Sequence, residues 1–386
     1  MEQSCCGITR LEIDLDIIAK NYQRLKDTVL PSSVMPVLKD NAYGHGLVRI
    51  AQRLCKEGCG TIACATLNEA LLLKKNCSAD LQILLLRALT DIELQIAVKN
   101  NFQITINSTR TLLTADKLAT AENKILKIHL KIDTGLGRLG LLPDEAPIVF
   151  EKIKGLKNVR LISVFSHLAV SYQKHEFSDN QLSLFRKISE IAKFFFPEVK
   201  CHIAATAGVI SLPDSYMDMV RVSSLLYGLS YSQEWPWGIE PALRWITPVI
   251  QAKQFPEGWN IGYKLLYKTK ANQKIGVLAV GAGDNYPYAL RLKSDVLICG
   301  KRCKVVGMSL DQTMVDLTPV PDAQEGYEAV LIGKSGEECI RAEELGVIAG
   351  TSPADILSKI PSRIPRYYYE NEMIAAVDDC CGSMNF

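Results

Sequence analysis

The most constraining feature of this sequence is the alternation, from residue 34 to about residue 230, of short apolar runs with longer amphipathic stretches. Short apolar runs predict buried strands, and the amphipathic stretches predict helices that cover a parallel sheet. Repeated eight times, this unit predicts a (β/α)8 barrel. The expected strands are Val34–Leu38, Thr61–Ala65, Leu81–Leu86, Phe102–Ile106, Leu126–Ile132, Val159–Phe165, Lys200–Ala205 and Met219–Val222.

The pattern changes after Gly228 to alternating runs punctuated by glycine and proline, which predicts a mainly antiparallel β domain. We therefore expect a barrel at residues 10–235 and a C-terminal β domain at 236–386, with Ser230–Gly238 as the linker. Arg10–Leu15 is one further strand candidate. Periodicity leaves open whether it belongs to the barrel or pairs with the second domain. The strands expected in the β domain are Val249–Gln254, Lys274–Val280, Val296–Cys299, Val305–Met308, Thr313–Leu317 and Glu328–Ile332.

Length and charge narrow the classes of function. With 386 residues and 48% hydrophobic residues, the chain can bury a large core. The formal net charge is +2 and no block of lysine and arginine stands out, so the sequence lacks the electrostatic signature of a nucleic-acid-binding protein. We expect small molecules as ligands.

The cysteines and the hydropathy pattern point to the cytoplasm. Twelve cysteines are sparse in so long a chain, and no second pair at zinc-ligand spacing accompanies Cys55 and Cys59, so we expect neither disulfides nor a metal site. No apolar stretch approaches the ~18 residues that span a bilayer, and residues 1–5 lack the layout of a signal peptide. The cysteines that lie in apolar runs, where we expect them to be buried, are Cys64, Cys201, Cys299 and Cys303.

Lys39 ends the first apolar run, and Gly44 and Gly46 bracket the turn into a helix predicted over residues 47–56. In barrel enzymes the carboxyl ends of the strands form the rim where active sites lie. A lysine at that rim can condense with a carbonyl group, such as that of pyridoxal phosphate. An isolated strand-end lysine is more often only solvated, so this interpretation depends on its neighbours.

Polar side chains with suitable chemistry follow several of the other expected strands. In a barrel they would surround one mouth, and loops after the seventh and eighth strands commonly bind a phosphate group through backbone N–H groups. None of these signals is specific alone, since a strand-end histidine is more often structural than catalytic. The residues at the expected mouth are Lys39, Tyr43, Lys131, Asp133, Arg138, His167, Thr206, Arg221, Ser223 and Ser224.

Four motifs, in matching order between about residue 10 and residue 370, resemble those of the alanine racemases. Such a series is far more specific than any one of its members. The resemblance implies a fold-type III pyridoxal-phosphate enzyme that is a homodimer, with each active site completed by the β domain of the partner. The motifs are Lys39–Gly46, His129–Gly140, Leu226–Gly228 and Thr313–Asp316.

The resemblance also implies roles for individual residues. Lys39 would hold the cofactor and act as the base on the D side, and Tyr263 would be the L-side base, acting across the dimer interface. Arg221 would donate to the pyridine nitrogen, and His167 would connect Arg221 to Tyr263. Arg138 would approach the cofactor ring oxygen and the substrate carboxylate. The remaining implied residues are Tyr43, Thr206, Ser223 and Ser224 at the cofactor, Leu310 and Asp311 as partner-supplied substrate contacts, and Lys131 as a carbamylated lysine that positions Arg138.

Some positions depart from the family pattern. Ala354 stands where the family usually has a tyrosine that narrows the substrate pocket, so we expect room beside the substrate β-carbon. Ser223 and Ser224 replace a glycine and an apolar residue, and they offer hydroxyl groups to the phosphate. Segments 282–285 and 307–311 also differ from the family. A missing pocket tyrosine is similarly a feature of serine/alanine racemase domains that are attached to membrane segments in vancomycin-resistance systems.

We therefore expect a pyridoxal-phosphate racemase that acts on alanine, serine or both. A free-standing racemase and the cytoplasmic domain of a membrane-anchored protein fit the sequence equally well. The alternatives are a fold-type III amino-acid decarboxylase, which would not be expected to carry residues 41–46 together with Tyr263, and a non-catalytic pyridoxal-phosphate-binding protein. The known carrier of the second kind lacks a β domain, whereas here a long segment follows the barrel.

Overall fold

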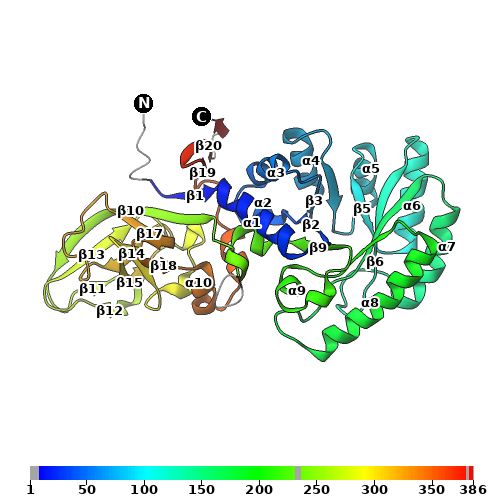
Figure 1. The fold of residues 1–386 in the computed structure, drawn as a ribbon. Helices are drawn as coiled ribbons and strands as arrows, with labels where there is room; N and C mark the ends of the chain where they lie inside the picture. Colours follow the sequence, from blue (N-terminus) through cyan, green and yellow to red (C-terminus); the bar gives the residue numbers. More distant parts are fainter. Residues whose placement is uncertain (1–7, 231–235, 380–381, 386) are drawn as a thin grey trace.

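The first unit is a barrel of eight parallel strands, which lies on the right of Figure 1. In this computed structural model, which describes residues 8–230, 236–379 and 382–385, β3 to β8 form one parallel sheet and β2 pairs with β9. The barrel closes where the Leu38 amide donates to the Ala63 carbonyl and the Arg221 amide donates to the Ala204 carbonyl. All eight expected strands are present: β2 (Ser33–Pro36), β3 (Thr61–Cys64), β4 (Gln82–Leu85), β5 (Gln103–Ile106), β6 (Leu126–Lys131), β7 (Val159–Phe165), β8 (Lys200–His202) and β9 (Met219–Val222).

Helices connect the strands and cover the outside of the barrel (Figure 1). The helix over residues 47–56 is present as expected and buries Leu47, Ile50, Ala51 and Leu54 on one face. The helices of this unit are α1 (Leu15–Thr28), α2 (Lys39–Tyr43), α3 (Leu47–Lys56), α4 (Leu67–Asn76), α5 (Asp91–Lys99), α6 (Thr109–Ala121), α7 (Ala146–Gly155), α8 (Glu176–Phe195) and α9 (Thr206–Ser211).

The second unit is built on an 11-stranded sheet in the order β18-β17-β14-β15-β16-β13-β10-β1-β19-β20-β21. The strand near the N-terminus, β1 (Arg10–Asp14), lies inside this sheet, antiparallel to β10 and parallel to β19. The other strands are β10 (Leu243–Phe255), β13 (Gln273–Leu278), β14 (Asp295–Ile298), β15 (Lys301–Met308), β16 (Thr313–Asp316), β17 (Glu328–Ser335), β18 (Glu338–Ile340), β19 (Arg366–Glu370), β20 (Met373–Asp379) and β21 (Gly382–Asn385), with the pair β11 (Asn260–Ile261) and β12 (Tyr267–Lys268) beside it.

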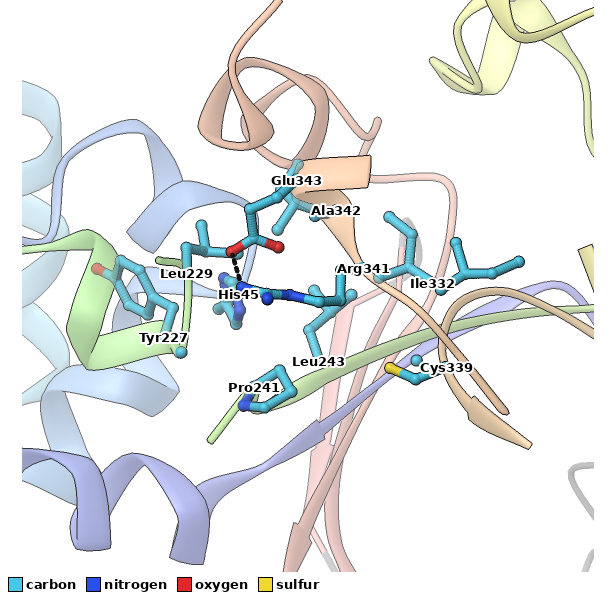
Figure 2. A pocket seen from close by; sticks show the side chains of 14 residues that line it. His45, Tyr227, Leu229, Pro241, Leu243, Ile332, Cys339, Arg341, Ala342 and Glu343 are labelled. Carbon is cyan, nitrogen blue, oxygen red and sulfur yellow. Dashed lines mark ion pairs between the residues drawn. The ribbon is translucent and has the colours of Figure 1, made fainter. Parts of the chain in front are cut away.

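The two units share a continuous core. Figure 2 shows their junction, where His45 and Tyr227 of the barrel lie near the ion pair of Arg341, just before α10 (Ala342–Ala349), and Glu343, in the first turn of that helix. The imidazole of His45 stacks on the Tyr227 ring with 4.6 Å between ring centroids. The cavity that remains between these groups is only about 20 Å³, so the junction is packed rather than open.

Two details of the sequence interpretation need comment. Cys299 was expected to be buried, which is wrong: it is exposed, because it lies at the β14–β15 turn with a φ of 49°. The linker predicted at Ser230–Gly238 falls partly outside the described residues, as do Cys5, Cys6, Cys380 and Cys381.

Within the described residues, no helix has the length and apolar character to cross a membrane, and no group of histidine, cysteine and carboxylate side chains could hold a metal ion.

Candidate active site

A cavity of about 410 Å³ lies at the carboxyl ends of the barrel strands. Loops that are far apart in the sequence contribute its walls, as expected for the active-site end of a barrel. Leu86, Arg87, Phe165, Ser171 and Tyr172 are lining residues that the sequence interpretation did not single out. The predicted residues that line this one cavity are Lys39, Tyr43, Lys131, Arg138, His167, Thr206, Arg221, Ser223 and Ser224.

Lys39 reaches the cavity from an unusual turn. The residues that follow it, 40–43, all have left-handed backbone angles, with φ values of 55°, 54°, 54° and 50°. Each non-glycine residue in this conformation costs on the order of 1 kcal/mol, so the turn persists only where surrounding contacts hold it. It places the Lys39 Nζ atom 3.7 Å from an Asp40 carboxylate oxygen and 5.7 Å from the centre of the Tyr43 ring.

Three side chains hold the left-handed turn in place. The Asp40 amide donates to Glu69 Oε1 over 2.7 Å, while Glu69 Oε2 caps the start of α4 through the Thr66 amide. Asn41 Oδ1 accepts from the Leu47 amide at the start of α3. Burial lowers the pKa of His45 to about 4, so its imidazole is neutral, and Nδ1 lies 3.0 Å from the carbonyl of Ala42. Glu69 was not predicted, because capping of α4 alone accounts for a glutamate three residues after Thr66. Its second contact, with the Asp40 amide, cannot be seen in the sequence.

Arg221 is a buried residue of the cavity floor, and its guanidinium has no carboxylate partner among the residues that the structure describes. Its Nη2 atom donates to the carbonyls of Ser166 and Ile203, and lies 3.3 Å from His167 Nδ1. Its Nη1 atom lies 2.5 Å from His202 Nδ1. Burial and, next, the charge of Arg138 lower the pKa of Arg221 to about 9. A cation is therefore fixed at the cavity floor by neutral acceptors.

Lys131 and Arg138 form a positively charged wall. Burial, followed by the charges of Arg138 and Arg221, lowers the pKa of Lys131 to about 8. The Asp133 carboxylate accepts from the amides of Gly135, Gly137 and Arg138 and so shapes the loop that carries Arg138. The pKa of His167 is lowered to about 3, first by burial and then by Arg221 and Arg138, so His167 is neutral.

Hydroxyl groups gather at another part of the cavity lining. The Tyr43 hydroxyl lies 3.3 Å from Ser223 Oγ, which in turn lies 3.5 Å from Thr206 Oγ1. The Ser223 amide donates to Thr206 Oγ1 over 3.0 Å. Together with the nearby Ser224, this group offers several donors to an anionic oxygen cluster such as a phosphate.

The other predicted site residues do not line this cavity. Tyr263, Leu310 and Asp311 are exposed on the β domain, with Tyr263 directly after β11 and the other two at the tip of the β15–β16 hairpin. Ala354 lies on α11 (Pro353–Ser358), which packs against the Lys39 turn so closely that a Cβ on Gly44 would meet the Leu357 carbonyl oxygen.

The two segments that depart from the family pattern lie side by side. The Ala282 amide donates to the Ser309 carbonyl over 3.0 Å, and the Gly283 amide donates to the Leu310 carbonyl over 2.7 Å. They therefore form one structural feature near Leu310 on the β domain rather than two independent changes.

The chemistry of these groups fits a phosphorylated aldehyde. An amine can bind the aldehyde carbon, a buried guanidinium can face a ring nitrogen, and hydroxyl groups can bind the phosphate, all within one cavity of sufficient size. A barrel with these groups at its mouth, followed by a β domain, defines a class of protein: enzymes that hold a phosphorylated carbonyl cofactor on a lysine.

Comparison with known proteins narrows this class. The family model for the N-terminal domain of alanine racemase matches residues 13–231, and the model for the C-terminal domain of alanine racemase matches residues 242–368. An alanine racemase from Carboxydothermus hydrogenoformans is 34% identical over 363 residues, which cover 92% of this chain and 98% of that protein. One from Halothermothrix orenii is 31% identical over 367 residues, 93% of this chain and 96% of that protein.

Solved structures agree with these matches. The crystal structure of alanine racemase from Bacillus anthracis with bound L-Ala-P matches with a TM-score of 0.87 and 30% identity, covering 97% of this chain and 98% of that one. Alanine racemase from Bartonella henselae with covalently bound pyridoxal phosphate matches with a TM-score of 0.86 and 26% identity, over 94% of this chain and 100% of that one.

The chain belongs to the alanine racemase family. It is an isomerase, a racemase that depends on pyridoxal phosphate. The fold class, the family and the cofactor predicted from the sequence are thereby confirmed.

Proposed function

We propose that this chain interconverts the L and D forms of alanine and of serine, as a homodimer with shared active sites. The observation that carries the proposal is the convergence of Lys39, Arg221 and the hydroxyl group of Ser223 on one cavity. These three groups match an aldehyde, a ring nitrogen and a phosphate, respectively. The barrel is taken as residues 10–235 and the β domain as residues 236–386, except that β1 (Arg10–Asp14) pairs with strands of the β domain and is counted with it.

Racemisation needs a proton removed from one face of the α-carbon and returned to the other, so two bases on opposite faces are required. When bound, pyridoxal phosphate supplies the electron sink that makes this proton acidic. Lys39 exchanges the proton on one face, and the partner subunit's Tyr263 exchanges it on the other. Arg138 binds the substrate carboxylate, and His167 connects Arg221 to that tyrosine.

Arg221 donates to the ring nitrogen and, being cationic, opposes protonation of that nitrogen. Tyr43, Thr206, Ser223 and Ser224 bind the phosphate. Lys131 is proposed to be carbamylated, because a pKa of about 8 leaves part of the amine neutral near neutral pH, and a carbamate would pair with Arg138.

The dimer is proposed because Tyr263 and Leu310 are exposed at 67% and 75% on the β domain, away from the cavity that they would complete. Leu265 and Leu266 beside Tyr263 are also exposed, which is unusual for adjacent leucines on a monomeric surface. We place the protein in the cytoplasm.

Activity towards serine is proposed because Ala354, on the helix α11 that packs against the Lys39 turn, stands where the family pattern has a tyrosine that narrows the substrate pocket. The kinship with membrane-attached serine/alanine racemases rests on the same position.

The test is a racemase assay with L-alanine and L-serine in parallel on the purified holoenzyme, following D-amino-acid formation. We expect turnover of both substrates. Turnover of alanine alone would remove serine from the proposal, and turnover of neither would contradict it.

A further inference from the structure

A continuous chain of hydrogen-bonded side chains crosses the interior of the barrel beneath the cavity. It takes one residue from each of six neighbouring strands, β4 to β9 (Figure 1). Because the strands are tilted in a barrel, the chain climbs from the amino-terminal ends of β4 and β5 to the cavity floor. In order, its members are Gln82, Gln103, His129, Ser163, His202 and Arg221.

Every link in this chain has hydrogen-bonding distance. Arg221 Nη1 lies 2.5 Å from His202 Nδ1, and His202 Nε2 lies 2.9 Å from Ser163 Oγ. Ser163 Oγ lies 2.6 Å from His129 Nδ1, and His129 Nε2 lies 2.7 Å from Gln103 Oε1. Gln103 Nε2 donates to Gln82 Oε1 over 3.2 Å.

The protonation of the two imidazoles can be deduced from the ends of the chain. A guanidinium has only donors, so His202 Nδ1 must accept, and a neutral His202 then carries its proton on Nε2. That N–H donates to Ser163 Oγ, which leaves the single hydroxyl proton of Ser163 for His129 Nδ1. His129 then also carries its proton on Nε2, and donates to Gln103 Oε1.

Both imidazoles are neutral, as this pattern requires. Burial is the largest cause that lowers the pKa of His129, to about 3, and that lowers the pKa of His202 well below its ordinary value. His129, Ser163 and His202 are all almost completely buried, so water cannot replace a missing partner.

We propose that Ser163 is a positioning residue for Arg221: its hydroxyl fixes the tautomers of His202 and His129, so that Arg221 always meets a lone pair. The proposal rests on the proposed role of Arg221 at the cofactor ring. Among the six hydrogen-bonded side chains, Ser163 alone must accept from one imidazole and donate to the other. The choice of donor and acceptor in the other hydrogen bonds therefore depends on it.

Loss of the hydroxyl would break this direction. The N–H of His202 would then have no acceptor on the Ser163 side, and the other tautomer would become competitive. That tautomer places an N–H on Nδ1, opposite a donor of Arg221 that lies 2.5 Å away, and two donors cannot share that space. Arg221 would move from its place at the cavity floor.

The first measurement is the histidine tautomers of the wild-type holoenzyme, from the side-chain 15N resonances of protein labelled only at histidine. The sequence has five histidines, so the spectrum is simple to assign with His129→Gln and His202→Gln. We expect His129 and His202 to carry their protons on Nε2. A proton on Nδ1 of His202 in the wild type would overturn the proposal.

The second measurement is Ser163→Ala. We expect the Nδ1–H form of His202 to appear, kcat for alanine to fall about tenfold, and KM to change less than about twofold, because the lost bond supports the charged Arg221 rather than the substrate. Ser189→Ala, which removes another buried serine hydroxyl on α8, is the control and is expected to leave both kcat and the tautomers unchanged.

An unchanged His202 tautomer in Ser163→Ala, or an unchanged kcat, would show that Ser163 only fills space. If Ser163→Ala does not fold, Gln103→Leu tests the same chain of hydrogen bonds by removing the acceptor of His129. We expect the Nδ1–H form of His202 to appear in this variant too, as a minor population. No change at His202 would again contradict the proposal. The tautomers do not depend on turnover, so a wild type that does not racemise alanine would contradict the proposed function and leave this inference standing.

Discussion

The predicted site has two halves, one at the barrel mouth and one around Tyr263 on the β domain. The two halves differ in how far their side chains are buried. At the mouth, Arg221 and Lys131 are 4% and 5% exposed, and Arg221 is oriented by several hydrogen-bond partners. On the β domain, Tyr263 and Leu310 are 67% and 75% exposed. Preorganised groups stabilise charge well because they need not reorient during reaction, whereas exposed groups must be fixed by something else. The difference supports the proposed homodimer, in which a second copy would complete the β-domain half.

Removing Lys39 tests the mouth half and has the largest expected effect. In Lys39→Ala we expect the visible absorbance of bound pyridoxal phosphate to disappear and kcat to fall by at least ~10²–10⁴-fold, because the attachment point and one base are lost together. Absorption spectra, steady-state rates and borohydride reduction check this, with the exposed Lys99→Ala as control. A reducible adduct that persists in Lys39→Ala would place the cofactor on another lysine.

Mixing two inactive variants tests whether the halves belong to different chains. Lys39→Ala and Tyr263→Phe homodimers are expected to be nearly inactive, while a heterodimer has one site with both bases. Random exchange between equal amounts is then expected to restore about a quarter of the wild-type rate, as expected for a two-fold interface.

The control for this experiment is the double variant Lys39→Ala/Tyr263→Phe mixed with either single variant, which cannot form a complete site. Subunit exchange is verified with a size tag on one variant. Exchange without recovery of activity would mean that both bases act within one chain.

The cost of burying Lys131 at the mouth can be measured as a loss of protein stability. Its pKa is lowered to about 8 from about 10.5, so the unfolded chain binds more protons between these values and stability rises with pH across that window. Below pH 8, Lys131 is charged in the folded as well as the unfolded chain, and the full free-energy cost of burying its charge is present. Lys131→Met is therefore expected to stabilise the apoprotein by about 2 kcal/mol at pH 7 and hardly at all near pH 10.5.

Urea denaturation in buffer free of bicarbonate measures this difference, with exposed Lys157→Met as the control. Added bicarbonate is expected to stabilise the wild type and not Lys131→Met if the lysine is carbamylated. A stability difference that does not depend on pH would show that Lys131 is charged at no cost.

The substitution at Ala354, on the helix that packs against the Lys39 turn, has the smallest expected effect. In Ala354→Tyr we expect the ratio of kcat/KM for L-serine to that for L-alanine to fall by on the order of tenfold, since space alone separates such substrates only modestly. The exposed Val347→Tyr on α10 is the control. An unchanged ratio would mean that Ala354 does not decide between serine and alanine, and would direct attention to the paired segments 282–285 and 307–311.

The sequence predicted the barrel well, because each parallel strand is buried on both faces and reads as an apolar run. It predicted β1 as a strand without its sheet, since a run such as Arg10–Leu15 has the same pattern in either partner. The helices α10 and α11 and the strands after residue 365 were not predicted, because short elements there carry little periodicity of their own.

For the site, the sequence predicted which strand ends carry the reactive groups, but not how they are oriented. Asp40 and Asn41 tolerate left-handed backbone angles, but the sequence did not predict a left-handed turn over residues 40–43, because supports such as Glu69 come from elsewhere in the fold. Ser163 resembles an ordinary residue of a strand, and only the register of β6, β7 and β8 places it between His129 and His202.

The position of β1 has a consequence for synthesis of the chain on the ribosome. Residues 10–14 are made before both of their neighbours in the sheet, β10 and β19, and β19 follows only at residues 366–370. The barrel can form while translation continues, but β1 must wait, with its backbone hydrogen-bonding groups unpaired, until β19 has been made.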